Sequence, residues 1–171
     1  MSNARNLANF LGTSTTVPSG KIVTASLPTG SVLQVVNNTN GVNQTITGST
    51  STEFTNIATT ITPTVTGSKI YVIVNLSLGS NYGSADWYVT RLYRDSTSNQ
   101  IGNRQDIYFN ERYEMIGPKL MHNIFDPLAT TAGTSRTYKI YGSGSVSGAD
   151  LQVNWSNNNT ESSMTLMEIA G

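Results

Sequence analysis

The chain has 171 residues, the length of a single domain, and 12% of them are charged, against roughly a quarter in an ordinary soluble domain. Ten Lys and Arg balance ten Asp and Glu, which leaves no basic surface for nucleic acid or an acidic membrane. The sequence has no cysteine, which excludes disulfides, thiolate zinc sites and cysteine nucleophiles, and no apolar run reaches the length of a membrane span. About a third of the residues are Ser, Thr or Asn, a mixture that favours short strands joined by tight turns.

The N-terminal residues carry the one convincing helical pattern. Apolar residues recur at the spacing of one helix face from Ala4 to Leu11, and Gly12 ends the pattern. A helix of about nine residues is not stable alone in water. Its apolar stripe must therefore dock on its own domain, on sister copies or on a larger particle.

Residues 13–30 are punctuated by Pro and Gly and read as a linker. We therefore expect residues 1–25 to form an N-terminal anchor helix and linker, and residues 26–171 to form the folded domain. The anchor residues are Leu7, Ala8, Phe10 and Leu11.

From Ser31 onward, short strand patterns follow one another, with turn residues about every ten positions. The strongest is residues 68–78, in which Ile70 to Leu78 alternate with a second set of side chains. The other predicted strands are residues 31–36, 45–47, 53–57, 87–93, 136–141, 151–155 and 164–169. About eight strands predict an all-β protein, a jelly-roll-like antiparallel β-sandwich with a short N-terminal helix or arm.

The last predicted strand, residues 164–169, is apolar, with Met164, Leu166, Met167 and Ile169 in six positions. In a jelly roll the first and last strands are neighbours. We therefore expect residues 31–36 and 164–169 to pair in the middle of a sheet, where both must be apolar.

Catalytic patterns are weak. His122 is the single histidine, it lies between apolar residues, and no G-x-S-x-G sequence accompanies it, so a packed or interface histidine is the simpler interpretation. The carboxylates of residues 106–126 would suit a glycosidase pair, but Arg104, Arg112 and Lys119 are interleaved with them and predict ion pairing instead. Calcium-loop and phosphate-loop motifs are absent from the sequence. We expect no enzyme, no cofactor and no metal site.

Residues 86–126 hold eleven of the twenty charged residues and half of the aromatic ones. Arg, Tyr and Trp are enriched at protein interfaces, so this belt is a candidate subunit interface. An ordinary core with loops and a carbohydrate-binding surface of exposed Tyr and Trp remain as alternatives. The candidate interface residues are Tyr93, Tyr108, Phe109, Arg112, Tyr113, His122 and Phe125.

Four stretches of the sequence carry a resemblance to a known family. They are SNARNLA at residues 2–8, LPTGSVLQVV at residues 27–36, SKIYVIV at residues 68–74 and TLMEIA at residues 165–170. With these stretches the chain resembles, over essentially its whole length, small structural proteins of marine bacteriophages such as cyanophages and pelagiphages.

The resemblance implies a virion component with a trimeric jelly roll, in the manner of a tail-fibre tip, a head fibre or a decoration protein, and it transfers no catalytic residue. We expect a homotrimer on the virion surface, on tail or capsid, that contacts other virion proteins through its N-terminal arm and a host-surface glycan or receptor through its loops. By composition these loops are residues 37–43, 79–84 and 157–162. The alternatives are a capsid decoration protein, a stand-alone carbohydrate-binding module and, last, a depolymerase.

Overall fold

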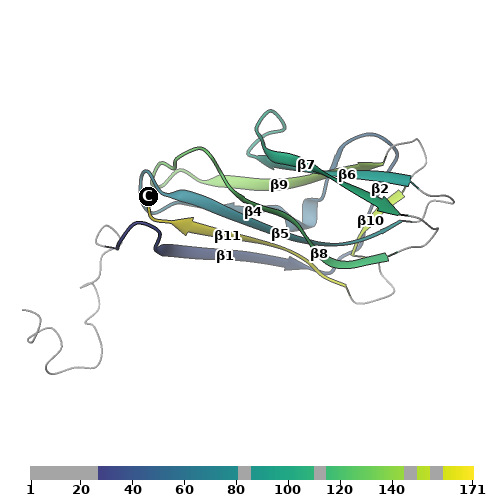
Figure 1. Cartoon of the computed structure of the whole chain (residues 1–171), viewed down its shortest axis with the longest axis horizontal. Coiled ribbons are helices and arrows are strands. Elements are labelled where there is room, and N and C mark those ends of the chain that lie inside the picture. The colour runs from purple at the N-terminus through teal and green to yellow at the C-terminus, as the bar shows by residue number, and fades with distance from the viewer. Residues whose placement is uncertain (1–26, 81–85, 110–114, 145–149, 155–159) are drawn as a thin grey trace, which may run out of the picture.

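The computed structural model describes residues 27–80, 86–109, 115–144, 150–154 and 160–171. Leu7, Ala8, Phe10 and Leu11, and with them the expected N-terminal helix, lie outside the described residues. The described residues form eleven strands and one short 3-10 helix, Thr55–Ile57, and the strands make two antiparallel sheets that lie face to face (Figure 1).

Sheet A contains the strands that were predicted to pair at the two ends of the domain. Its main strands, in spatial order, are β1 (Val32–Asn40), β11 (Ser162–Ile169), β5 (Lys69–Ser80) and β8 (Met115–Phe125). Two short strands extend this sheet, because β10 (Asp150–Val153) pairs with the end of β5 and β2 (Gln44–Thr47) pairs with β10.

Sheet B is built around β9 (Arg136–Gly144). The short strands β3 (Thr52–Glu53) and β4 (Thr59–Ile61) both pair with one edge of β9. On its other edge follow β6 (Asp86–Arg94) and β7 (Gln100–Phe109).

The strand order is that of a jelly roll. β3 and β4 both pair with β9 and count as two halves of one strand position. With the short strands β2 and β10 left aside, the chain then has eight strand positions. Sheet A then contains the first, eighth, third and sixth positions, and sheet B the second, seventh, fourth and fifth. This double-sheet arrangement of two Greek keys confirms the predicted fold class.

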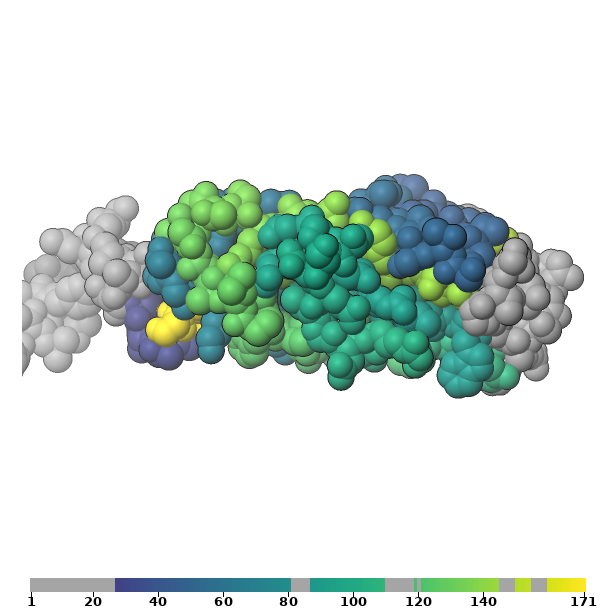
Figure 2. Space-filling model, turned by 90° about the horizontal axis from the view of Figure 1, so that it is seen from above, coloured from purple at the N-terminus to yellow at the C-terminus, as the bar shows by residue number. Residues whose placement is uncertain are grey.

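The predicted pairing of the first and last strands is confirmed, with Val36 opposite Leu166 and Val35 opposite Met167. β11 lies inside sheet A between β1 and β5. β1, however, is the edge strand of this sheet, so it does not lie in the middle as expected. The C-terminal residues lie against the residues that lead into β1, at one end of the elongated molecule (Figure 2). There the Gly30 amide donates to the Ala170 carbonyl at 3.0 Å.

The core lies between the two sheets. β5 contributes the longest apolar face, five fully buried side chains from Ile70 to Leu78 at alternate positions. Opposite it, Tyr88 and Leu92 of β6 and Tyr138 of β9 are also fully buried. Each such side chain stabilises the fold by roughly 1.5–3 kcal/mol relative to an exposed one.

Candidate interaction surfaces

Asp126 is buried and fully engaged in holding three strands together. Its carboxylate, at the end of β8, contacts the guanidinium group of Arg94 on β6 and, at 3.4 Å, that of Arg136 on β9. The Tyr138 hydroxyl donates to it at 2.7 Å and the Leu128 amide at 3.0 Å. Burial, and then the hydrogen bond to Asp126, raises the pKa of Tyr138. Four contacts fill the roughly four acceptor positions of a carboxylate, so Asp126 is not placed for acid–base chemistry.

Glu168 on β11 is a second buried carboxylate, and it is held by neutral donors. The amides of Thr64 and Val65 donate to it at 2.9 and 3.0 Å, and the Ser68 hydroxyl and the Gln34 amide at 2.7 Å each. Burial pushes the pKa of Glu168 upward, but the hydrogen bonds from Thr64, Ser68, Val65 and Gln34 outweigh burial and lower the pKa overall. The carboxylate therefore stays charged and fastens the segment that leads into β5 to the sheet.

This cluster joins three of the stretches that carry the sequence resemblance. Gln34 belongs to residues 27–36, Ser68 to residues 68–74 and Glu168 to residues 165–170, and these stretches supply the neighbouring strands β1, β5 and β11. The Gln and the Ser of two stretches both donate to the Glu of the third. One polar residue from each of the three stretches thus takes part in holding sheet A together.

His122 is packed in the core. It lies on β8, is 5% exposed, and its Nε2 atom is 3.3 Å from the hydroxyl oxygen of Thr90 on β6 in the opposite sheet. Burial lowers the pKa of His122 from 6.5 to about 4, so the ring is neutral near pH 7. A buried ring between two sheets is not placed to act as a base on a bound substrate.

Asp106 is a further described carboxylate of residues 106–126, and it is exposed. Asp106 pairs with the exposed Arg104 at 3.1 Å, as the interleaved charges predicted, and Glu111 and Glu114 lie outside the described residues. Within the described part of the chain, no three His, Asp or Glu side chains are grouped to hold a metal ion. In the same part, no helix is long and apolar enough to span a membrane.

The candidate interface residues lie in the core, on the outer faces of both sheets, or outside the described residues. Phe109 is fully buried in the core and His122 nearly so, which corrects their assignment, because a side chain enclosed by its own chain cannot contact a partner. Tyr93 and Tyr108 lie on the outer face of sheet B. Phe125 lies on the outer face of sheet A, and Arg112 and Tyr113 lie outside the described residues.

The three predicted recognition loops are partly strand. Residues 37–40 continue β1, residues 79–80 end β5 and residue 162 begins β11. Residues 81–84 and 157–159 lie outside the described residues.

The outer face of sheet A carries a continuous row of apolar side chains that crosses all four main strands. Val35 of β1 lies opposite Met167 of β11, Met167 opposite Tyr71 of β5, and Tyr71 opposite Phe125 of β8. The exposed fraction is 54% for Val35 and 49% for Phe125, while the two middle residues are half-buried by their neighbours. The rings of Tyr71 and Phe125 have centroids 4.6 Å apart. We call these four residues the apolar row.

The outward-facing rows on the two sides of the apolar row differ in polarity. At the end of the sheet where β1 begins, Ile169 lies opposite Lys69, and the exposed Val32 lies opposite Ile169 on β1. Toward the middle of the sheet, Asn37 and Thr165 lie opposite each other and are joined by a hydrogen bond of 2.7 Å. The apolar surface therefore covers one end of sheet A.

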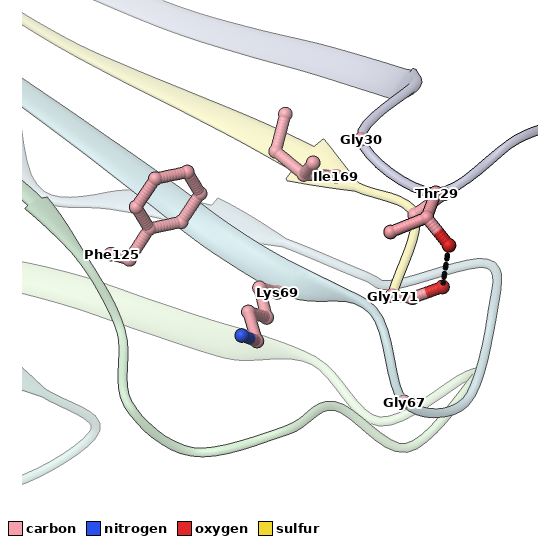
Figure 3. A pocket seen from close by; sticks show the side chains of 8 residues that line it. Thr29, Gly30, Gly67, Lys69, Phe125, Ile169 and Gly171 are labelled. Carbon is pink, nitrogen blue, oxygen red and sulfur yellow. Dashed lines mark hydrogen bonds between the residues drawn. The ribbon is translucent and has the colours of Figure 1, made fainter.

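A groove of about 480 Å³ lies at this end (Figure 3). Phe125, Lys69 and Ile169 line it from β8, β5 and β11, and Gly30, Gly67 and Gly171 line it as well. The Thr29 hydroxyl donates to the Gly171 carbonyl at 3.1 Å.

Sequence reasoning found one of the four residues of the apolar row, Phe125. Val35 and Met167 were assigned to strands but not to a surface. The signal was present, because residues 164–169 are apolar at both alternations, and only one alternation can face the core of a two-layer sandwich. Which residues of four strands share a row depends on register, which the sequence does not state.

The outer face of sheet B carries an exposed aromatic pair. Trp87 of β6 lies opposite Tyr108 of β7, with ring centroids 4.6 Å apart and ring planes inclined by 45°. Their exposed fractions are 55% and 41%. The belt of residues 86–126 thus supplies aromatic side chains to both outer faces as well as to the core.

Solved structures that resemble this chain include viral proteins of low sequence identity. No protein-family model matches the chain, and no curated protein matches it. The solved structures that resemble it include VP2 of infectious bursal disease virus in T=1 particles, with a TM-score of 0.39, 14% identity, and coverage of 80% of this chain and 36% of that one. For the VP2 subviral particle the TM-score is 0.38 and the identity 12%, and the match covers 80% of this chain and 38% of that one. For the enzymatically active domain of tailspike protein 4 of bacteriophage CBA120 the TM-score is 0.25 and the identity 12%, and the match covers 79% of this chain and 19% of that one. The chain thus spans little more than a third of the length of the VP2 chains that it matches.

Proposed function

We propose that this protein is a non-enzymatic structural protein of a bacteriophage virion, a self-associating jelly-roll subunit displayed on the particle surface as a trimeric fibre or adhesin. The observation that carries the proposal is the apolar row on sheet A. The sequence resemblance to small structural proteins of marine bacteriophages supplies the biological setting.

An antiparallel sheet with one face in water normally alternates apolar residues inside with polar residues outside. The outer face of sheet A breaks this rule at Val35, Met167, Tyr71 and Phe125, and again at Ile169. Contiguous exposed apolar surface of this kind marks an interaction site. The two fully buried carboxylates, Asp126 and Glu168, are by contrast saturated by hydrogen bonds, which supports a structural role for them over an enzymatic one.

A second copy of the chain is the occupant that this face fits best. On the three neighbouring rows the one charged side chain is that of Lys69, so few charges lose their hydration when copies of the face come together. The net charge of the chain is zero, which removes long-range repulsion between copies. Copies related by a threefold axis each turn this face toward the axis. The other end of every sandwich then remains exposed.

A capsid decoration protein is the second candidate. It shares the fold and the apolar face but would bury that face against capsid proteins rather than against itself. The N-terminal segment, residues 1–25, serves as the attachment to the particle in both cases.

The native mass of the purified protein tests the proposal. We expect the protein to be a trimer and Val35→Glu to be a monomer, because a carboxylate in the centre of the interface would lose its hydration without a partner. Val42→Glu is the matched control, since Val42 is 59% exposed and Val35 54%, but Val42 lies in the turn after β1 and outside the apolar row. Both substitutions at exposed positions should change the free energy of unfolding of the monomer by less than about 0.5 kcal/mol.

A wild-type protein that is monomeric at every concentration would overturn self-association and favour the decoration protein. A trimer that survives Val35→Glu as well as Val42→Glu would place the contact elsewhere on the molecule.

A further inference from the structure

The exposed pair Trp87 and Tyr108 stands out against its own neighbours in the chain. Tyr88 and Phe109, the next residues on the same two strands, are fully buried and pack edge to face with centroids 5.2 Å apart. Strand alternation therefore turns one aromatic pair into the core and the other into solvent. Burial in the core accounts for the inner pair. The outer pair also packs ring against ring across the two strands, but 55% of Trp87 and 41% of Tyr108 remain exposed to a ligand.

Charged groups lie beside the aromatic pair on the same face of sheet B. Along β7, Arg104, Asp106 and Tyr108 occupy alternate positions and so point to the same side. Arg104 and Asp106 are both exposed and form an ion pair of 3.1 Å. Asp106 lies opposite Val89, the next outward position after Trp87 on β6. A two-residue step along a strand is about 7 Å, the width of one sugar ring plus its hydroxyl groups.

This combination fits a sugar ring. One face of a pyranose presents C–H groups that pack on the electron-rich face of an aromatic ring, and its edge presents hydroxyl groups that need donors and acceptors. Trp87 and Tyr108 offer the aromatic faces, Asp106 offers acceptors and Arg104 offers donors.

Other ligands fit this surface less well. A nucleic acid would need a surplus of positive charge for its phosphates, whereas Arg104 and Asp106 cancel each other. A protein partner would have to bury that ion pair, at a desolvation cost that a sugar avoids because its hydroxyl groups replace water. The geometry points to a pyranose-binding site on the outer face of β6 and β7, formed by Trp87, Tyr108, Arg104 and Asp106.

The biological role of this site rests on the proposed function, because a site on sheet B would let a surface-displayed subunit contact a host glycan. Binding itself does not require self-association. A single stacked ring gives a dissociation constant of about 1 mM, and joining several sites in one oligomer multiplies the affinity.

Tryptophan fluorescence tests the site directly. The chain contains two tryptophans, so Trp155→Phe leaves Trp87 as the reporter. The full-length protein is titrated with the methyl pyranosides of glucose, galactose, mannose, N-acetylglucosamine and rhamnose. We expect a saturable change with at least one of them, at about millimolar concentration, and a loss of affinity of about tenfold in Tyr108→Ala.

Phe125→Ala, in the same Trp155→Phe background, is the matched control, since Phe125 is an exposed aromatic residue on the opposite sheet. It should leave the sugar affinity per subunit unchanged while weakening the oligomer, so that failure of the sugar site and failure of self-association are seen separately. The site is overturned if none of the five sugars gives a saturable change up to about 100 mM, a hundredfold above the expected constant. It is also overturned if Tyr108→Ala binds as tightly as the parent protein.

Discussion

At the scale of single residues, His122 makes the stability of this fold depend on pH. Burial lowers its pKa from 6.5 to about 4, so between these values the unfolded chain binds a proton that the folded chain does not. The stability that depends on a neutral His122 is complete above about pH 6.5 and is lost as the pH falls toward 4. The loss amounts to about 3 kcal/mol over that range.

His122→Gln should remove this part of the pH dependence, because glutamine keeps a polar group near Thr90 but does not titrate. Urea unfolding at pH 7, 5.5 and 4 measures it. We expect the free energy of unfolding of the wild type to fall more steeply than that of His122→Gln, while the carboxylates contribute equally to both proteins. Parallel curves would show that His122 takes up its proton in the folded protein at its ordinary pKa.

Glu168 acts in a lower pH range. Its pKa is lowered in the folded protein, so the stability that it provides is present above its ordinary pKa of 4.5 and is lost as the pH falls below that value. At pH 7, Glu168→Gln should destabilise the protein by about 3 kcal/mol, because an amide nitrogen would face the N–H groups of Thr64 and Val65.

Glu161→Gln is the control for this experiment, since Glu161 is exposed and precedes the same strand. It should leave the free energy of unfolding within about 0.5 kcal/mol of the wild type. Equal effects of the two substitutions in urea unfolding would show that the charge of Glu168 is not what fastens the segment before β5.

At the scale of strands, β9 depends on a residue without a side chain. A Cβ atom added at Gly142 would lie 2.6 Å from Cε1 of Phe54 and 3.0 Å from Cδ2 of Leu151. Phe54 is 1% exposed, so its ring has no room to move aside. Gly142→Ala should therefore lower the free energy of unfolding by about 1–3 kcal/mol, the usual effect of overpacking a core.

Gly41→Ala provides the comparison in the same unfolding assay. The nearest side-chain atom to its added Cβ is at 3.5 Å, an ordinary contact, and Gly41 is not among the glycines with positive φ. We expect no loss of stability there. A Gly142→Ala protein as stable as Gly41→Ala would mean that β9 shifts to accept the methyl group.

A strand could be predicted from the sequence where apolar residues alternate regularly along its core face. β5 and β11 were predicted because their core faces alternate without interruption. β7 was missed because six of its ten residues are exposed, and Ile101, Ile107 and Phe109 are the buried ones. β8 was missed because Pro118, Lys119 and His122 interrupt its apolar pattern, and two register shifts interrupt its pairing with β5. β7 and β8 are edge strands, which pair with only one neighbouring strand, so they tolerate such interruptions.

At the scale of the whole molecule, the fold was more predictable than its surfaces. The recurring short strands and the pairing of the first with the last indicated a jelly roll, although β7 and β8 were missed. The candidate interface failed at Phe109 and His122 because composition identifies a belt but does not say which alternate residues face inward. Tyr108 and Phe109 are adjacent and have opposite environments, exposed and fully buried. One residue of register separates a surface from the core.

The two candidate surfaces occupy opposite outer faces of the sandwich. The apolar row is on sheet A, and the pair Trp87 and Tyr108 is on sheet B. An oligomer that buries the first face therefore leaves the second exposed in every copy. A weak site repeated in this way becomes a strong one when the ligands are repeated on the opposing surface.

The position of β11 inside sheet A also governs when the protein can fold during translation. β5 is complete at Ser80, but β11, which covers one of its edges, begins at Ser162, about 80 residues later. At a synthesis rate of 5–20 residues per second, β5 waits about 4–16 s for this neighbour, with its backbone edge and its row of apolar side chains open to other chains. Long-range pairing of this kind folds slowly. Until β11 is made, that edge of β5 has no partner from its own chain, so we expect correct folding to depend on the dilution of nascent chains or on their shielding by a chaperone.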